Sequence, residues 1–146
     1  MKGEPIVILL VEDDPAHYEI VRRNFESSHL ANRLLWVEDG QAGLDYLYRK
    51  NEFNDLDKFP RPNLILLDLR LPRVDGLEIL KTFKSDPRLT DIPVVVLTTS
   101  SADTDMIKAC NCHANGYMVK PLDISKLSKL IDNVGYHGPV VEPACL

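Results

Sequence analysis

Short apolar runs alternate with amphipathic segments along most of this sequence. The apolar runs have the length of buried strands, and we expect strands at residues 6–11, 34–37, 64–67, 93–97 and 117–119. The segments that follow have helical spacing of apolar residues, and we expect helices at residues 15–28, 40–50, 75–84, 102–113 and 123–134. Strict alternation predicts an α/β fold, a parallel sheet with helices on both faces. Right-handed crossovers then favour a flavodoxin-like (βα)5 fold, doubly wound, with strand order 2-1-3-4-5.

Two local patterns refine this expectation. Asp14 precedes Pro15, which suits the first helical position, so Asp14 is predicted to cap the first helix. Ile20, Val21 and Phe25 are expected on the buried face of that helix. Residues 51–62 are polar and contain two prolines, which predicts a loop longer than the usual connection.

Composition limits the class of protein. With 146 residues, 45% of them hydrophobic and 27% charged, the chain is expected to form one globular domain. The net charge of -5 argues against nucleic acid as a direct partner, because phosphate binding needs clustered Lys and Arg. No apolar run approaches the ~18 residues of a membrane span. Three cysteines without a regular framework fit a reducing cytoplasm, so we expect a cytoplasmic protein without membrane partners.

Carboxylates follow two of the predicted strands. Glu12 and Asp13 come directly after residues 6–11, and Asp68 comes directly after residues 64–67. The strand order 2-1-3-4-5 makes the first and third strands neighbours, so these side chains would meet at the switch point of the sheet. Crowded carboxylates repel one another and imply a bound cation, for which Mg²⁺ (or Mn²⁺) is the candidate. Asp68 is then a candidate nucleophile beside a metal.

Two further strand ends carry groups suited to phosphoryl chemistry. The fourth predicted strand leads into Thr98 and Thr99, and the fifth ends in Lys120 and Pro121. A lysine and a hydroxyl near a metal suit the oxygens of an incoming phosphoryl group. Each residue alone has a plainer interpretation, since an aspartate after a strand is commonly a helix cap and Lys-Pro is commonly a turn. Only their combination favours phosphoryl transfer.

The chain resembles the receiver domain of the two-component response regulator (CheY-like) family. Four segments carry the resemblance in family order, namely LVEDD at residues 10–14, LDLRLP followed by DG at 67–76, VLTT at 96–99 and GYMVKP at 116–121. The resemblance implies a receiver domain over residues 1–134 and a C-terminal tail over 135–146, with no separate output domain. Residues 51–62, 69–76 and 97–100 look like the stand-alone regulators that partner bacterial phytochromes.

The resemblance implies a metal site and a phosphoacceptor. Asp68 would accept a phosphoryl group from a sensor histidine kinase, with a bacterial phytochrome as the candidate kinase. Asp13 would bind the metal directly, and Glu12 would act through a water molecule. The backbone carbonyl of Arg70 would be a further metal ligand.

The resemblance also implies the residues that respond to phosphorylation. Lys120 would pair first with Asp68 and then with the phosphoryl oxygens, and the Thr98 hydroxyl would hydrogen-bond to the phosphoryl group. Tyr117 would be the aromatic switch. The peptide bond between Lys120 and Pro121 is expected to be cis, and Gly76 is expected to shape the loop after Asp68.

Several interpretations of function remain open at this point. The resemblance implies a phosphoacceptor that supports its own phosphorylation and autodephosphorylation, not an enzyme with an external substrate, and that switches a protein-interaction surface. A constitutive interaction module with a vestigial site is the alternative. The last helix and the tail, with Val140 and Val141, are either a homodimer contact or a disordered end. Trp36 is expected on the second strand, remote from the acidic cluster and therefore a weak fluorescent reporter.

Overall fold

A computed structural model describes residues 5–28, 31–69, 71, 76–98, 114–120, 122–123 and 125–129. Its centre is a five-stranded sheet in the order β2-β1-β3-β4-β5, and every neighbouring pair of strands is parallel. The strands are β1 (Ile6–Val11), β2 (Asn32–Val37), β3 (Leu64–Asp68), β4 (Val94–Thr98) and β5 (Gly116–Val119). The predicted fold class and strand order are confirmed.

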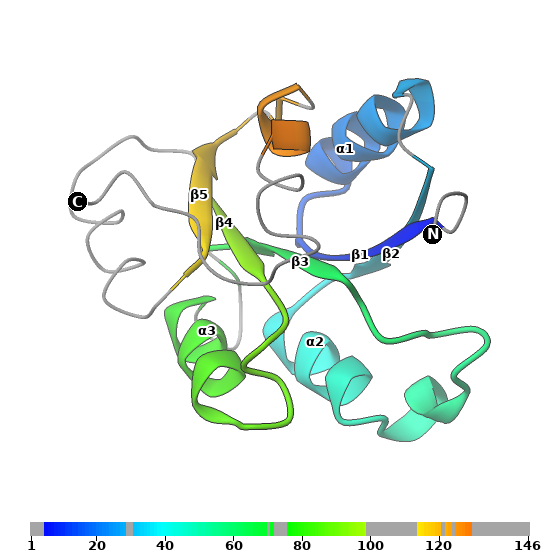
Figure 1. Ribbon diagram of the computed structural model, residues 1–146, viewed down its shortest axis with the longest axis vertical. Coiled ribbons are helices and arrows are strands. Elements are labelled where there is room, and N and C mark those ends of the chain that lie inside the picture. Colours follow the sequence, from blue (N-terminus) through cyan, green and yellow to red (C-terminus); the bar gives the residue numbers. More distant parts are fainter. Residues whose placement is uncertain are drawn as a thin grey trace.

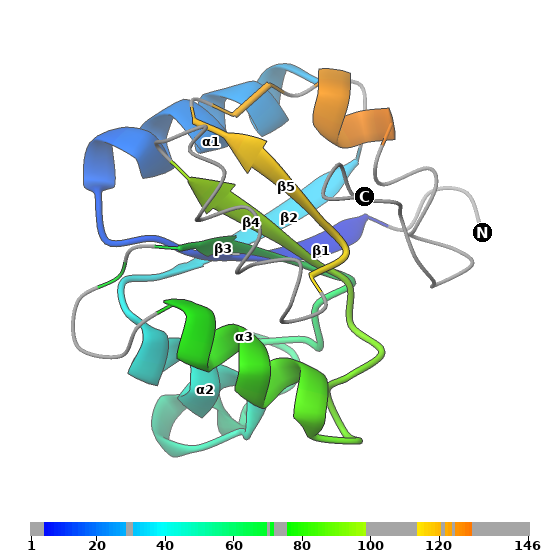
Figure 2. The same cartoon turned by 90° about the vertical axis from the view of Figure 1, so that its left-hand side faces the viewer.

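Helices cover both faces of the sheet (Figures 1 and 2). The described helices are α1 (Pro15–Ser27), α2 (Gly40–Leu47) and α3 (Gly76–Ser85), with a 3₁₀ turn η1 at Asn51–Asn54. Residues 125–129 are also helical and lie on the same side of the sheet as α1, while α2 and α3 lie on the other side. The predicted helix at 102–113 and the tail at 135–146 fall outside the described residues.

Two separate hydrophobic cores result from the alternation of side chains along each strand. Leu9 and Val11 of β1 face the core beneath α2 and α3. Ile8 and Leu10 face the core beneath α1, where they pack with Phe25. Both cores contain fully buried strand residues, which explains why the strand segments are continuously apolar.

The first helix begins as predicted but buries a different set of residues. The Asp14 side chain accepts a hydrogen bond from the Ala16 backbone at 2.9 Å, so the predicted cap is confirmed. Val21 and Phe25 are buried as expected, but Ile20 is 42% exposed, and that part of the prediction is wrong. His17 takes the buried position near the start of the helix, because it has a polar partner inside the protein.

The loop at residues 51–62 is more ordered than its polar composition predicts. Within it, η1 buries Phe53, whose ring lies 5.3 Å from Tyr46 and 4.9 Å from Phe59 between ring centroids. Phe59 also meets Tyr46 edge to face, so the three rings pack together and join this loop to α2. In the described part of the chain, no helix has both the length and the apolar character needed to span a membrane.

Candidate functional site

Three carboxylates meet where β1 and β3 end. The pairing of Val11 with Leu67 puts Glu12 and Asp13 level with Asp68. Directly after Asp68, the Leu69 backbone donates a hydrogen bond to the Leu97 carbonyl at 2.9 Å. One oxygen from each of the three carboxylates lies within 4.8 Å of the others. Glu12 and Asp68 are buried, whereas Asp13 is exposed. The structure therefore brings together the acidic residues that the sequence places at the switch point.

Lys120 lies between the two buried carboxylates. Its Nζ is 3.1 Å from Asp68 Oδ2 and 2.9 Å from Glu12 Oε1. The Lys120 backbone donates to the Thr98 carbonyl at 2.7 Å, which fixes the residue at the end of β5 beside β4. Burial lowers the pKa of Lys120, but its contacts with Glu12 and Asp68 outweigh burial and raise the pKa above its ordinary value. The lysine is thus a fixed positive charge shared by two carboxylates.

Glu12 has its carboxylate held on several sides. Oε1 accepts from His17 Nδ1 at 2.6 Å, and Oε2 accepts from the Asp14 backbone at 3.2 Å and from Lys120 at 3.1 Å. Burial raises the pKa of Glu12, but the hydrogen bonds from His17 and Lys120 lower it further, to about 2. Glu12 is therefore ionised at neutral pH although it is fully buried.

Two contacts of this site could not be expected from the sequence. His17 is one, because a histidine on a helix gives no sign of its partner. Trp36 is the other: its Nε1 donates to the Glu12 carbonyl at 2.7 Å, and its ring stacks on Tyr18 with centroids 4.1 Å apart. The expectation that Trp36 is remote from the acidic cluster is wrong, because β2 runs beside β1 and ends at the same edge.

Comparison with known proteins identifies the family. The response regulator receiver domain profile matches residues 8–132. The chain belongs to the response regulator receiver family. This receiver is 44% identical over 131 residues to the probable methanogenesis regulatory protein FilR2 of Methanothrix harundinacea, covering 90% of this chain and 82% of FilR2. It is 41% identical over 130 residues to the response regulator Rcp1 of Synechocystis, covering 89% of this chain and 86% of Rcp1.

Solved structures agree with this family. The Mn²⁺-bound form of Rcp1 matches with a TM-score of 0.74 and 38% identity, covering 94% of this receiver and 99% of that chain. The phosphorylated cyanobacterial phytochrome response regulator RcpA also matches with a TM-score of 0.74, at 36% identity, covering 89% of this receiver and 91% of that chain. The expected family is confirmed, and so is the similarity to phytochrome response regulators.

The donor set of this receiver fits a divalent metal. Glu12, Asp13 and Asp68 offer hard carboxylate oxygens at mutual distances that one small cation can bridge. Lys120 pairs with Glu12 and Asp68, and Asp13 adds a third carboxylate close by, so the site keeps an excess of negative charge that a cation would neutralise. A bound Mn²⁺ in the related Rcp1 structure is consistent with this fit.

The structure describes some of the other expected site residues in full, some in part and some not at all. Thr98 is buried at the end of β4, 2% exposed, and its backbone carbonyl accepts a hydrogen bond from the Lys120 backbone. The backbone of Tyr117 pairs with Val96 in the sheet, but its side chain lies outside the described part of the structure. Arg70 and Pro121 also lie outside it, so the third metal ligand and the cis peptide bond remain predictions.

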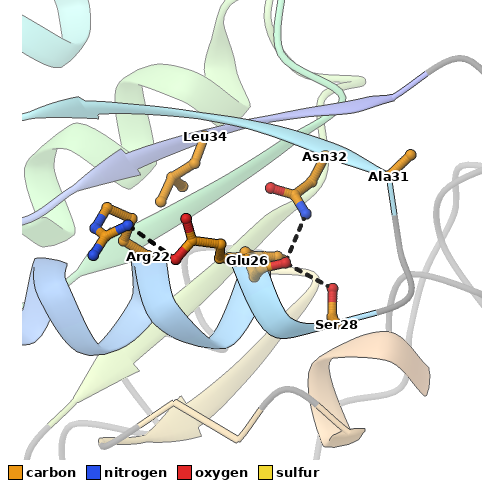
Figure 3. Close-up of a pocket in the computed structure, with 7 residues that line it drawn as sticks. Arg22, Glu26, Ser28, Ala31, Asn32 and Leu34 are labelled. Atoms are coloured by element: carbon orange, nitrogen blue, oxygen red, sulfur yellow. Dashed lines mark hydrogen bonds and ion pairs between the residues drawn. The ribbon is translucent and has the colours of Figure 1, made fainter.

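A pocket lies at the amino end of β2 (Figure 3). It lies between the last turn of α1 and the start of β2, and its lining includes Arg22, Glu26 and Asn32. Arg22 is paired with Glu26 at 3.2 Å, and the Asn32 amide donates to the Phe25 carbonyl at 3.0 Å. Each of these polar groups thus has a partner within the protein, and we assign no ligand to this pocket.

Proposed function

We propose that this receiver accepts a phosphoryl group on Asp68 from a sensor histidine kinase, in a reaction that needs a divalent metal. Receiver domains are phosphoacceptors, and the phosphorylated RcpA structure is one such relative. The observation that carries the proposal is the buried Asp68 carboxylate, ion-paired to Lys120 at 3.1 Å and next to two further carboxylates. Such an arrangement combines a nucleophile with the charges that the transfer requires.

The transfer follows from the chemistry of these groups. An ionised Asp68 oxygen attacks the phosphorus of the phosphohistidine; the new P–O bond forms as the P–N bond breaks, and the imidazole leaves with the electron pair. The metal would be held by Asp13, Asp68 and Glu12 and would supply positive charge next to the phosphoryl oxygens. Lys120 supplies the second positive charge, and Thr98 is the hydroxyl donor to the phosphoryl group. No general base is required, so the residues position and neutralise.

The proposed consequence is a change in an interaction surface on the side of β5. Thr98 and Lys120 are joined through the backbone at the ends of β4 and β5, so a change at the phosphoryl group reaches β5 directly. Lys126 and Lys129 are exposed on the helical residues 125–129 and belong to this surface. Tyr117 is the aromatic residue proposed to move with Thr98. Phosphorylation would then bias a two-state equilibrium of this face.

Partners and location remain proposals of the same kind. We propose a cytoplasmic protein organised as a receiver over residues 1–134 and a tail over 135–146. A bacterial phytochrome is one candidate kinase, because RcpA is a phytochrome response regulator. FilR2 is named for methanogenesis, so the pathway must be assigned by testing kinases directly. Homodimerisation through the last helix and the tail remains a prediction, which sedimentation with and without residues 135–146 can decide.

Incubation with a phosphorylated sensor kinase tests the proposed function. Wild-type receiver should take the phosphoryl group from the kinase in Mg²⁺, and transfer should stop when EDTA is added. Asp68→Asn should accept none, whereas Asp45→Asn, a change on the far α2 helix, should behave as wild type. Undiminished transfer to Asp68→Asn would refute Asp68 as the acceptor. A wild type that accepts nothing from any kinase or small phosphodonor would favour a module with a vestigial site.

A further inference from the structure

His17 is a buried histidine next to the acidic cluster that the proposed transfer does not use. It lies in the first turn of α1, five positions after Glu12, and is 5% exposed. The Asp14 cap and Pro15 fix the start of this helix, so the direction of the His17 side chain is set by the fold. A buried polar side chain requires a partner, and the identity of that partner indicates what it does.

The contact between His17 and Glu12 is short and has a defined direction. Nδ1 of His17 lies 2.6 Å from Oε1 of Glu12. An ionised carboxylate only accepts hydrogen bonds, so Nδ1 is the donor. Nε2 is buried and has no hydrogen-bond partner among the described residues. Glu12 is therefore the only side chain in the described structure to which His17 is hydrogen-bonded.

The donors to the Glu12 carboxylate are either shared with Asp68 or not shared with it. His17 and the Asp14 backbone touch Glu12 alone within this site, whereas Lys120 is shared with Asp68. In the proposed function, Lys120 turns to the phosphoryl oxygens, and its hold on Glu12 then weakens. A glutamate has one more rotatable bond than an aspartate, so it needs an anchor to keep one orientation. Of the two side chains that donate to the Glu12 carboxylate among the described residues, His17 is the one that Asp68 does not share.

We propose that His17 is a positioning residue that holds the Glu12 carboxylate in the orientation required for divalent metal binding. This inference rests on the proposed function, because it assumes that Glu12, Asp13 and Asp68 hold a metal. Partners that orient the ligands of a metal site commonly change its affinity tenfold to a hundredfold when they are removed. This role of His17 would explain how a glutamate contributes to the same metal site as two aspartates.

Calorimetric titration of Mg²⁺ into purified variants tests this role. His17→Leu keeps a side chain of similar size but removes the Nδ1 hydrogen-bond donor. It should weaken Mg²⁺ binding by about tenfold to a hundredfold. His17→Asn places an amide Nδ2 near the position of Nδ1 and should recover most of the affinity. His17→Phe also lacks a donor and replaces His17→Leu if the latter does not fold.

A matched variant separates positioning from stability. Val21→Ala opens a cavity on the same buried face of α1, one turn after His17, without touching Glu12. It should lower the melting temperature and leave the Mg²⁺ affinity of the folded protein unchanged. The inference is overturned if His17→Leu and His17→Phe bind Mg²⁺ like wild type, or if Val21→Ala weakens binding as much as they do. A wild type that binds no Mg²⁺ would overturn the proposed metal site as well, so the two failures are distinguishable.

Discussion

Replacing Lys120 with methionine should destabilise this receiver strongly in the absence of metal. The lysine side chain is 12% exposed and contacts Glu12 and Asp68, which are 0% and 5% exposed. At the observed separations of 2.9 and 3.1 Å, each contact carries on the order of 5 to 6 kcal/mol of Coulomb attraction for an effective dielectric constant of about 20. Desolvation of the three groups offsets much of this attraction. The net cost of leaving buried carboxylates without their cation is about 3 to 5 kcal/mol.

Urea denaturation in EDTA at pH 7.5 measures this cost. Lys120→Met should lose about 3 to 5 kcal/mol of unfolding free energy, equivalent to roughly 10 °C in melting temperature for a domain of this size. Lys126→Met is the control, because it removes an exposed lysine nearby and should stay close to wild type. The deficit of Lys120→Met should shrink at pH 5, where its unpaired carboxylates bind protons, and shrink when Mg²⁺ is added. A loss below about 1 kcal/mol at pH 7.5 would show that the lysine behaves like a surface charge and would refute the reasoning.

Three further outcomes follow from the structure. A methyl group on Gly76 would lie 2.6 Å from the Asp68 carbonyl oxygen. Gly76→Ala should therefore displace the chain after Asp68 and slow its labelling by acetyl phosphate. Gly43→Ala is the control that should be tolerated, because the added methyl group would have its nearest contact at 3.4 Å. Phe53→Ala should cost about 3 to 5 kcal/mol in thermal or urea unfolding, because it empties the aromatic cluster, and Phe53→Leu should cost clearly less. The pKa of Glu12 is lowered from 4.5 to about 2 in the folded state, so its stabilising contribution is present above pH 5 and is lost as the pH falls towards 2. Acid unfolding curves should therefore flatten in Glu12→Gln, and identical slopes for the two proteins would contradict that assignment.

Most of the fold could be predicted from the sequence because buried parallel strands are continuously apolar. The strand residues 64–67 are fully apolar in sequence and buried in the structure, and the same holds for residues 94–97 of β4. The acidic site could be predicted for a related reason. Once the strand order is known, the topology alone brings Asp68 next to Glu12 and Asp13. The strand order is therefore enough to predict this cluster, without knowledge of side-chain packing.

Features that depend on packing between distant segments could not be predicted. Helical periodicity places Ile20 inside and says nothing of His17, whose burial depends on where the first turn of α1 meets Glu12. The polar composition of residues 51–62 gives no indication that Phe53 packs against Tyr46 of α2. Trp36 reaches the site only because β2 and β1 end at the same edge. Each of these contacts joins residues whose spacing in the sequence does not predict that they meet.

We propose above all that the Asp68 carboxylate accepts the phosphoryl group and thereby acts as a metal-dependent covalent switch. Its most direct test is the intact mass of the receiver after incubation with acetyl phosphate, with and without Mg²⁺, followed by peptide mapping. In Mg²⁺ the receiver should gain one phosphoryl group on the peptide that contains Asp68. No such gain should occur in EDTA or in Asp68→Asn. An unchanged mass in Mg²⁺, or a phosphoryl group mapped to another residue, would contradict it.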